Sequence, residues 1–556
     1  MVQESLNANV MGLNGQWIPT KYAFNLLHEF PGMSLCGVKP PNSYKPDCKI
    51  STDSPNNFKL INQYIHQLLI RWGSVCRQLT TIRLVQDTQV QQRSPLFQGI
   101  EVDLVKLYQT VQEENGIEAV QNNNNWEIVA TKMKLASHRG KAKKLENIYL
   151  KYLLNYNALT CGERDAAIVA VDKCWQEREK QALYRAQNPL WRQDRMRQGI
   201  PLSDGDPSHM SLVCAEAEEC VTPGRSCNYK SFKKLAEQVQ KTYFPDGTPT
   251  PEEVEIDYWD KVMTAPSHVC VHAASMDAKE FGYGFTDDPS LLSSSHPWNL
   301  KWLSCSSSNI LSYLGPSQGA SAPTIHLGML YTTSCWHMDP TMVPWIEYLH
   351  HGPPKIWYSV SADQVNAFRT AVEAICPFAV QNKEIWLACD VIMIPPMMLA
   401  QYGVKVERYV QHAGEYVIVY PNTYYACIET GFTVSEGVYF APCTLLKNIE
   451  SIFLNLRGSC EPSLFSMERL LIAIAENKDT PYLMLQRVAS ILVSVLESEL
   501  SYRQQLGNRN IETLLPGVNN HCEIYFLTQV LHLVDGFCLL PKNSFICERY
   551  GKIYFM

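Results

Sequence analysis

The feature that most limits how this chain can fold is a series of short apolar runs between about residues 255 and 445. The runs are rich in β-branched and aromatic residues, and glycines and prolines bound them. They read HVCVHAA, TIHLGMLYTTSCW, PKIWYSV, EYVIVYP and FTVSEGVYFA. Many short strands at close spacing are typical of a β-sandwich or a jelly-roll barrel. We therefore predict a β-barrel as a major unit of the chain.

One region of this β-rich segment contains a pair of potential metal ligands. His337 and Asp339 are two residues apart, and such residues project from the same face of a strand. An imidazole and a carboxylate on one face, completed by a second histidine, are how non-haem iron oxygenases hold Fe(II). Lys355 follows in the next β-rich run and could pair with the distal carboxylate of a 2-oxo-acid co-substrate. The pattern predicts at least part of an oxygenase site.

Composition sets broader limits on what the chain is. A chain of 556 residues is expected to form two to four domains. The net charge of −7 means that nucleic-acid binding must come from a local basic patch. We find no apolar run that could span a bilayer and no signal peptide, so no membrane partner is expected. The 19 cysteines have no repeating spacing, which favours reduced thiols in a cytosolic or nuclear protein.

Helical periodicity precedes the β-rich region. Between residues 57 and 157 apolar residues recur at three- and four-residue spacing, starting with FKLINQYIHQLLIRWG. A short glycine-containing turn between NWEIVATKMKL and KAKKLENIYLKYLLNY resembles a helix-turn-helix. Six basic residues around that turn are candidates for DNA binding: Lys132, Lys134, Arg139, Lys141, Lys143 and Lys144. Such a run can be only a solvated helix face, but the scarcity of acidic residues within it favours contacts with phosphates.

The remaining segments are predicted to be mostly helical. Residues 163–200 read as a long charged helix, and prolines with a glycine mark a linker near residues 200–210. After residue 460 the helical period returns, with Ser463 or Ser466 as candidate N-caps.

With these segments in order, the chain resembles the Jumonji family of chromatin proteins. Residues 22–50 resemble its JmjN segment through KPPNSYKPDCK. Residues 57–157 resemble its ARID domain, a helical DNA-binding module, through IRWG, EVDLVKLYQTVQEENGIEAV and NWEIVATKMK. Residues 255–445 resemble its JmjC domain through FGYGF, PWNL, LGMLYTTSCWHMD, YLHHGPPKIWY and AGEYVIVYP. The pieces TSCW, GVKVERYVQ and LFSMERLL are most similar to the founding member, which is regarded as lacking demethylase activity.

The resemblance and the periodicity together define a fold class and five segments. The fold class is α+β and multidomain, with a helical ARID-like bundle containing a helix-turn-helix, a JmjC double-stranded β-helix (jelly-roll or cupin) barrel and a C-terminal helical region. The segments are a JmjN-like segment at 22–50, an ARID-like DNA-binding domain at 57–157, a charged helix and linker at 158–210, a JmjC-like β-barrel with its N-terminal lead-in at 211–450, and a helical region with a degenerate zinc-finger-like tail at 460–556.

The resemblance implies a metal site that has lost a ligand. The family binds Fe(II) through a His-x-Asp/Glu pair and a second histidine in a later strand. His337 and Asp339 match the pair, whereas Tyr425 stands at the position of the second histidine. A phenol with a pKa of about 10 is neutral at pH 7 and is a poor ligand for Fe(II). We expect these three residues to be vestigial positions that hold no metal.

The implied co-substrate pocket is altered as well. Lys355 matches the lysine that pairs with 2-oxoglutarate, but Glu347 stands where the family has an asparagine. His272 and Tyr439 match a family tyrosine and asparagine respectively. A carboxylate near the lysine would repel that of the co-substrate, and a Glu347–Lys355 ion pair would occupy the lysine. We expect these four residues to be vestigial positions too.

Two functions follow as hypotheses. The first is a non-catalytic, nuclear, chromatin-associated transcriptional repressor that contacts the DNA backbone with weak sequence preference. Its implied partners are chromatin or histones and Polycomb repressive complex 2. The alternative is an active Fe(II)/2-oxoglutarate-dependent histone lysine demethylase. The family's zinc module would begin at Cys522, but Tyr525 replaces its second cysteine, so we predict no zinc.

Overall fold

The computed structural model describes most of the chain between residues 100 and 507 and shorter pieces outside that span. The described residues are 8–11, 17–20, 34–41, 44, 46–49, 57–66, 81–82, 95–97, 100–133, 135, 140–173, 221–264, 267–273, 276–278, 283–317, 320–339, 341–375, 393–459, 464–507, 544–547 and 552–555.

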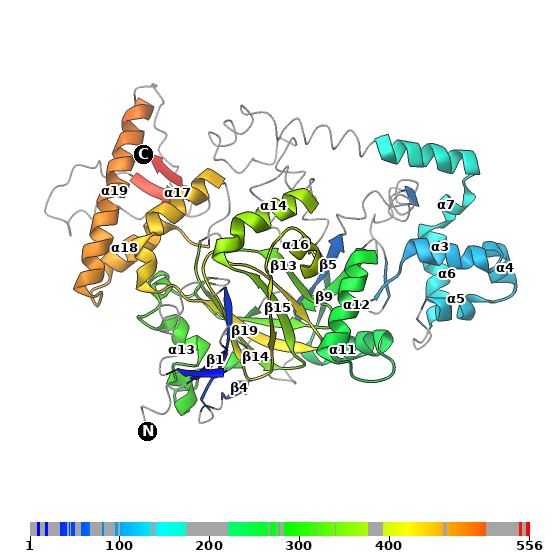
Figure 1. The fold of residues 1–556 in the computed structure, drawn as a ribbon, viewed down its shortest axis with the longest axis horizontal. Helices are drawn as coiled ribbons and strands as arrows, with labels where there is room; N and C mark the ends of the chain where they lie inside the picture. Colours follow the sequence, from blue (N-terminus) through cyan, green and yellow to red (C-terminus); the bar gives the residue numbers. More distant parts are fainter. Residues whose placement is uncertain are drawn as a thin grey trace.

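Two antiparallel sheets form a barrel at the centre of the molecule (Figure 1). The larger sheet has the order β10 (Met276–Asp277), β12 (Thr324–Gly328), β19 (Thr433–Tyr439), β14 (Trp345–His351), β17 (Tyr416–Val419), β3 (Leu35–Lys39), β1 (Ala8–Met11) and β2 (Trp17–Thr20). The smaller sheet has the order β13 (Thr333–His337), β18 (Tyr424–Glu429), β15 (Lys355–Val360) and β16 (Glu407–Gln411). The prediction of an α+β chain with a jelly-roll barrel is confirmed.

The inner strands of the barrel are apolar along most of their length because both of their faces are covered. Every residue of β15 and of β18 is buried, and the six Cα pairs between the two strands run from Lys355–Glu429 to Val360–Tyr424. Outside the barrel lie three 3₁₀ turns and a set of helices around the sheets. These elements are η3 (Leu292–Ser295), α13 (Leu300–Cys305), η4 (Ile310–Leu314), η5 (Ala362–Gln364), α14 (Val365–Ile375) and α16 (Pro396–Gln401).

A third sheet links the barrel to the helices that precede it. Its order is β8 (Val221–Cys227), β5 (Phe58–His66) and β9 (Ser267–Ala273). The helices α11 (Tyr229–Tyr243) and α12 (Pro251–Thr264) follow β8 in the chain. Two further strand pairs lie outside these sheets. Strand β4 (Cys48–Lys49) pairs with β11 (Gly284–Phe285), far along the chain, and β6 (Leu96–Phe97) forms a hairpin with β7 (Ile100–Glu101).

The helix predicted at the start of the 57–157 segment is wrong, because residues 58–66 form strand β5. Phe58 and Leu60 are buried while Lys59 between them is exposed, which is the alternation of a strand. Strand β5 has hydrogen-bonded neighbours on both sides, β8 and β9. The apolar spacing of this segment fitted a helix as well, and the partners that decide the matter lie about 160 to 210 residues further along the chain.

The helical bundle itself begins later, at α3, and its prediction is confirmed. It consists of α3 (Leu104–Glu113), α4 (Gly116–Asn122), α5 (Trp126–Lys132), α6 (Lys141–Tyr152) and α7 (Leu154–Ala158). Asp103 caps α3 by accepting a hydrogen bond from the Lys106 N–H at 3.0 Å. The predicted long charged helix is helical at residues 161–173, and its remainder lies outside the described residues.

The C-terminal helices form on the side of the barrel opposite the bundle (Figure 1). They are α17 (Ile449–Ser459), α18 (Met467–Glu476) and α19 (Tyr482–Gly507), with η6 (Cys443–Lys447) before them. Ser466 is the N-cap of α18, as one of the two predicted candidates. In the predicted tail, β20 (Ser544–Cys547) pairs with β21 (Lys552–Phe555), while Cys522 and Tyr525 lie outside the described residues. None of the helices in the described residues is long and apolar enough to cross a membrane.

Candidate functional site: a buried lysine and a histidine–aspartate pair

The predicted metal pair lies at the end of β13, beside β18. His337 is the Cα partner of Tyr425, and their rings are 4.1 Å apart between centroids. The Nδ1 of His337 lies 2.7 Å from the carbonyl oxygen of Cys335, which holds the imidazole by its own strand. Burial lowers the pKa of His337 below its ordinary value, so the ring is neutral at pH 7.

The carboxylate of Asp339 is bound by its own loop. Its Oδ1 accepts hydrogen bonds from the N–H and the hydroxyl of Thr341, at 2.8 and 2.6 Å. Its Oδ2 accepts a longer one, 3.3 Å, from the Val343 N–H. Burial raises the pKa of Asp339 to about 6. Met342, in the same loop, has a φ of 54°, a left-handed conformation that is costly for its side chain.

At the third predicted ligand position stands a phenol, that of Tyr425, which lies against the imidazole of His337. Within the part of the chain that the structure describes, no group of three histidine, cysteine, aspartate or glutamate side chains is arranged to hold a metal ion.

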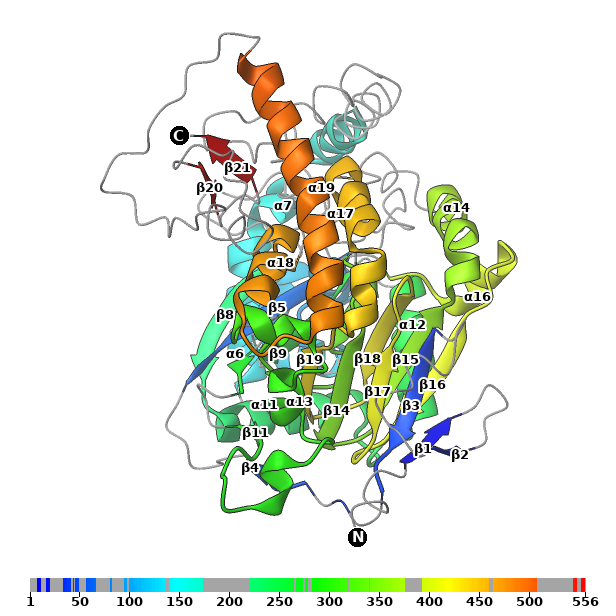
Figure 2. The same ribbon diagram turned by 90° about the vertical axis from the view of Figure 1, so that its left-hand side faces the viewer.

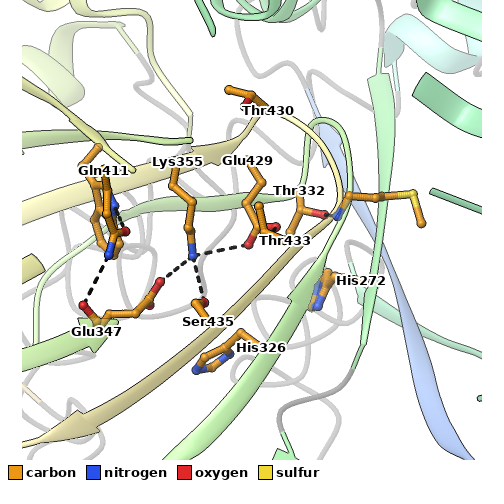
Figure 3. Close-up of polar contacts among 12 residues, drawn as sticks. His272, His326, Thr332, Glu347, Lys355, Gln411, Glu429, Thr430, Thr433 and Ser435 are labelled. Atoms are coloured by element: carbon orange, nitrogen blue, oxygen red, sulfur yellow. Dashed lines mark hydrogen bonds and ion pairs between the residues drawn. The ribbon is translucent and has the colours of Figure 1, made fainter. Parts of the chain in front are cut away.

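The ammonium group of Lys355 lies in the barrel interior between side chains of both sheets (Figure 3). Its Nζ is 2.6 Å from Glu347 Oε1, 3.3 Å from Ser435 Oγ and 3.4 Å from Glu429 Oε1. Lys355 is only 4% exposed, and Glu347 and Glu429 are each 5% exposed. Burial alone would lower the pKa of Lys355, but the carboxylates, Glu347 first, raise it well above its ordinary value. The expected Glu347–Lys355 ion pair is present.

Glu347 has further partners that hold it in place. The indole N–H of Trp345 donates to its Oε2 at 3.3 Å. Gln411 donates to the backbone carbonyl of Glu347 at 3.3 Å, as Figure 3 shows. Burial would raise the pKa of Glu347, but the positive charge of Lys355 and the nearby His326 bring it below its ordinary value. Glu347 is therefore ionised at neutral pH and stays paired.

Glu429 is a member of this cluster that the sequence reasoning did not single out. It is the last residue of β18, and the hydroxyl of Thr433 donates to its Oε2. It lies against Gly328, where an added Cβ would stand 1.7 Å from Glu429 Oε2, so only glycine leaves room for the carboxylate. Burial raises its pKa above the ordinary value. The available sequence signal was a charged residue ending the otherwise apolar run YYACIE.

The other two predicted co-substrate positions have local partners of their own. The Nδ1 of His272, on β9, lies 3.0 Å from the carbonyl oxygen of Ala273. Burial lowers the pKa of His272. Tyr439 packs edge-on against the Trp345 ring, with centroids 4.8 Å apart. Burial raises the pKa of Tyr439, and the charge of Asp339 adds to this shift, so the phenol is close to the metal-pair loop.

The predicted DNA-binding residues separate into two kinds. Lys132 forms ion pairs with Glu113 at 3.1 Å and Glu114 at 2.8 Å. Lys141 pairs with Glu127 at 3.0 Å. The acidic partners come from α3, from the turn after it and from α5. They lie outside the basic run, so the scarcity of acidic residues within that run did not reveal them.

The cations best placed for phosphates are on the first turn of α6. Lys143 and Lys144 are exposed there. The helix begins directly after its N-cap residue Gly140, which has a left-handed φ of 72°. Lys134 and Arg139 lie outside the described residues.

Comparisons with known proteins match two parts of the chain to domain families. Residues 324–440 match the JmjC domain, described as a hydroxylase, and residues 72–157 match the ARID/BRIGHT DNA binding domain. The second match begins after strand β5, later than the predicted start at residue 57.

Individual relatives span more of the chain. The chain is 28% identical over 536 residues to Protein Jumonji of Gallus gallus, covering 88% of this chain and 43% of the relative. It is 25% identical to Lysine-specific demethylase JMJ703 of Oryza sativa subsp. japonica, over 59% of this chain and 30% of the relative. It is 27% identical to Lysine-specific demethylase 5D of Homo sapiens, over 45% and 17%. The chain thus spans less than half the length of each of these relatives.

Proposed function

Because the chain contains a JmjC domain and an ARID domain, we propose that it is a non-catalytic chromatin regulator of the nucleus. In this proposal the ARID helices bind DNA through phosphate contacts. The JmjC barrel is a structural scaffold that binds neither Fe(II) nor 2-oxoglutarate.

The observation that carries the proposal is the state of the Lys355 ammonium group. A lysine ammonium has three N–H donors. Three acceptors, from Glu347, Ser435 and Glu429, lie within 3.4 Å of it. No donor is left for an incoming carboxylate, which would have to displace a buried glutamate. Leaving one member of a buried ion pair uncompensated costs about 3–5 kcal/mol, enough to weaken co-substrate binding by about a hundred-fold or more.

The metal half of the site supports the same conclusion. Tyr425 contributes a neutral phenol instead of a third strong ligand, and the oxygens of Asp339 already accept three hydrogen bonds. A site that lacks one of three ligands loses several kcal/mol of metal affinity on the scale of roughly 10–16 kcal/mol for complete sites.

Anaerobic titration of the purified chain with Fe(II) and 2-oxoglutarate tests the catalytic part. We expect no heat of binding and no metal retention at millimolar ligand. Stoichiometric iron, or succinate released in the presence of a methylated histone peptide, would overturn the proposal.

A restoring variant tests its physical reason. Tyr425→His with Glu347→Asn supplies the missing ligand and removes the competing carboxylate from Lys355. We expect metal uptake in this double variant and none in the matched control, Tyr425→Phe with Glu347→Asn. Equal uptake in both would show that the phenol is not what prevents binding.

The DNA-binding part rests on Lys143 and Lys144. Replacing both by glutamate should weaken binding to duplex DNA. It should also lower the slope of log affinity against log salt by about 0.9 for each phosphate that the protein no longer neutralises. Unchanged affinity and slope would show that Lys143 and Lys144 do not bind DNA.

The second candidate function is an active Fe(II)/2-oxoglutarate-dependent histone lysine demethylase. It is favoured by the presence of both His337 and Asp339 and by the lysine-specific demethylases among the relatives. The iron and succinate measurements above distinguish the two candidates. Transcriptional repression and partnership with histones or Polycomb repressive complex 2 are proposed on the resemblance, and co-precipitation of that complex from nuclear extract with the chain would test them.

A further inference from the structure

The helix α11 presents a basic face on the outside of the molecule. Its buried residues, Tyr229, Phe232, Leu235, Ala236 and Val239, face the core. Lys230, Lys234 and Lys241 are exposed and fall within about 40° of one another around the helix, opposite that buried side. Arg225, at the end of β8 just before the helix, is exposed as well. We call these four residues the α11 basic surface.

This surface is unusual in a chain whose net charge is −7. The helix carries four lysines and a single acidic residue, Glu237. Only Lys233 is directed toward the core, with its Nζ 5.9 Å from the centre of the Phe432 ring. The three lysines of the surface span twelve residues, from Lys230 to Lys241, or roughly 16 Å of helix. Duplex DNA carries one charge per about 1.7 Å of its axis, so a span of this length faces several phosphates.

Part of the acidic charge of the helix that follows in the chain is paired with cations. In α12, the Asp257 carboxylate is paired with Lys261. The Glu255 carboxylate accepts hydrogen bonds from Arg408 Nε at 2.9 Å and from its Nη2 at 2.7 Å. These carboxylates are neutralised by cations of their own, so α12 repels DNA less than its sequence suggests.

The α11 basic surface and the ARID helices are held together by one core. A single contiguous hydrophobic cluster contains the buried residues of α3 to α7 and those of α11. In this cluster, Phe58 of β5 packs edge-on against Phe232 of α11, with ring centroids 5.9 Å apart. Figure 1 places α11 on the side of the barrel that carries the ARID helices, away from α17–α19.

We propose that the α11 basic surface is a second contact for the DNA backbone, beside the ARID helices. This inference rests on the proposed DNA binding by the ARID domain and extends the bound length of duplex beyond it. The contact is to phosphates and carries no base preference of its own. Its partner is double-stranded DNA long enough to reach from the ARID helices to α11.

Duplex length and charge reversal together test it, with fluorescence anisotropy on the full chain. Variant A is Lys143→Glu with Lys144→Glu. Variant B is Arg225→Glu, Lys234→Glu and Lys241→Glu. The control is Lys447→Glu with Lys478→Glu, two exposed lysines on the α17–α19 side. Each protein is titrated with a duplex of about 12 bp and one of about 35 bp at several salt concentrations, and circular dichroism verifies that it is folded.

We expect variant A to weaken binding to both duplexes. Variant B should bind the short duplex as the unaltered chain does, and the long one more weakly, with a salt slope lower by about 0.9 for each phosphate left without its cation. The control should bind as the unaltered chain on both. If variant B equals the control on the long duplex while variant A is weakened, the inference is wrong and the proposed function stands.

The remaining outcomes are also decisive. If variant A binds normally and variant B is weakened on both duplexes, the α11 basic surface binds DNA and the ARID proposal is wrong. If neither variant differs from the control, or if the unaltered chain binds neither duplex, both are wrong. A neutralised version of variant B, with glutamines in place of glutamates, should show a smaller loss of affinity of the same kind.

Discussion

Lys355 and Glu347 belong to different sheets, β15 and β14, so their ion pair crosses the barrel interior. Ser435 on the larger sheet and Glu429 on the smaller one complete the set around the ammonium. At the level of single residues, the position that resembles a co-substrate site is an internal network of buried charges. Such a network stabilises little in net terms, but removing one member is costly.

The cost of breaking this network can be measured. Lys355→Met leaves Glu347 as an uncompensated buried charge and should destabilise the barrel by about 3–5 kcal/mol. Lys355→Met with Glu347→Leu removes this ion pair, leaves Glu429 with the Thr433 hydroxyl as its donor, and should recover part of that stability. Hydrogen exchange of the β15 and β18 amides reads the local unfolding free energy. If the single and double variants are destabilised equally, the two buried charges do not compensate each other and the prediction is wrong.

His326, beside this network, makes stability depend on pH. Burial lowers its pKa to about 4, whereas a histidine in the unfolded chain titrates near 6.5. Between these values the unfolded state binds a proton that the folded state does not, so stability falls as the pH is lowered through this window. His326→Gln should reduce the pH dependence of the unfolding free energy by up to about one proton. Unfolding midpoints measured from pH 7 to pH 4 test this. His412→Gln, at an exposed histidine, is the matched control, and parallel curves for all three proteins would contradict the prediction.

Among the elements, strand β3 joins the two sheets of the barrel. It pairs with β17 from Leu35 to Val38, as Figure 2 shows at the front of the barrel. Ser34, next to it, reaches the other sheet with its Oγ 2.8 Å from Ser359 Oγ. Lys39 forms an ion pair with Glu415 at 3.2 Å. The predicted JmjN-like segment packs, in its described part, along the barrel wall.

Gly37 is the position where this packing is tightest. An added Cβ would lie 2.0 Å from the Tyr409 ring, whose hydroxyl donates to Glu415 at 2.8 Å. Gly37→Ala should therefore cost about 1–3 kcal/mol of overpacking. Gly162→Ala is the control, because that helical glycine has nothing within 4 Å of an added Cβ and should gain about 0.4–1 kcal/mol. Thermal unfolding should show opposite signs for the two variants, and a neutral Gly37→Ala would contradict the close approach.

For the whole molecule, the ARID helices and the barrel-side elements share one hydrophobic cluster, while α17–α19 have another. Phe58 belongs to the first and connects β5 to α11. Because the ARID helices and the barrel-side elements share this cluster, we predict that their stabilities are coupled through the third sheet.

Removing the connecting side chain tests this coupling. Phe58→Ala should cost about 3–5 kcal/mol and should speed hydrogen exchange in α6 and α11 together. Phe465→Ala, in the other cluster against Phe453 at 5.4 Å, should affect α17 and α18 and leave α6 unchanged. Faster exchange confined to the neighbours of Phe58 would show that the domains unfold independently.

The sequence alone was enough for the barrel, the helical bundle from α3 and the Glu347–Lys355 pair. Apolar runs bounded by glycine and proline specify short strands locally, and opposite charges at two matched positions of a known pattern predict an ion pair. Strand β5 was missed because its apolar spacing fits a helix equally well, and the choice depends on hydrogen-bond partners remote in the chain. Glu429 was missed because nothing near it in sequence marks it as a partner of Lys355.

What the residues determined by themselves is the type of most local elements and the chemical change at Tyr425. Only the tertiary structure decided which charges are paired. It gave Lys132 and Lys141 acidic partners from other parts of the bundle, left Lys143 and Lys144 exposed, and surrounded Lys355 with acceptors from three other strands. Charge pairing depends on distances of a few ångströms between side chains far apart in sequence, and folding alone sets those distances.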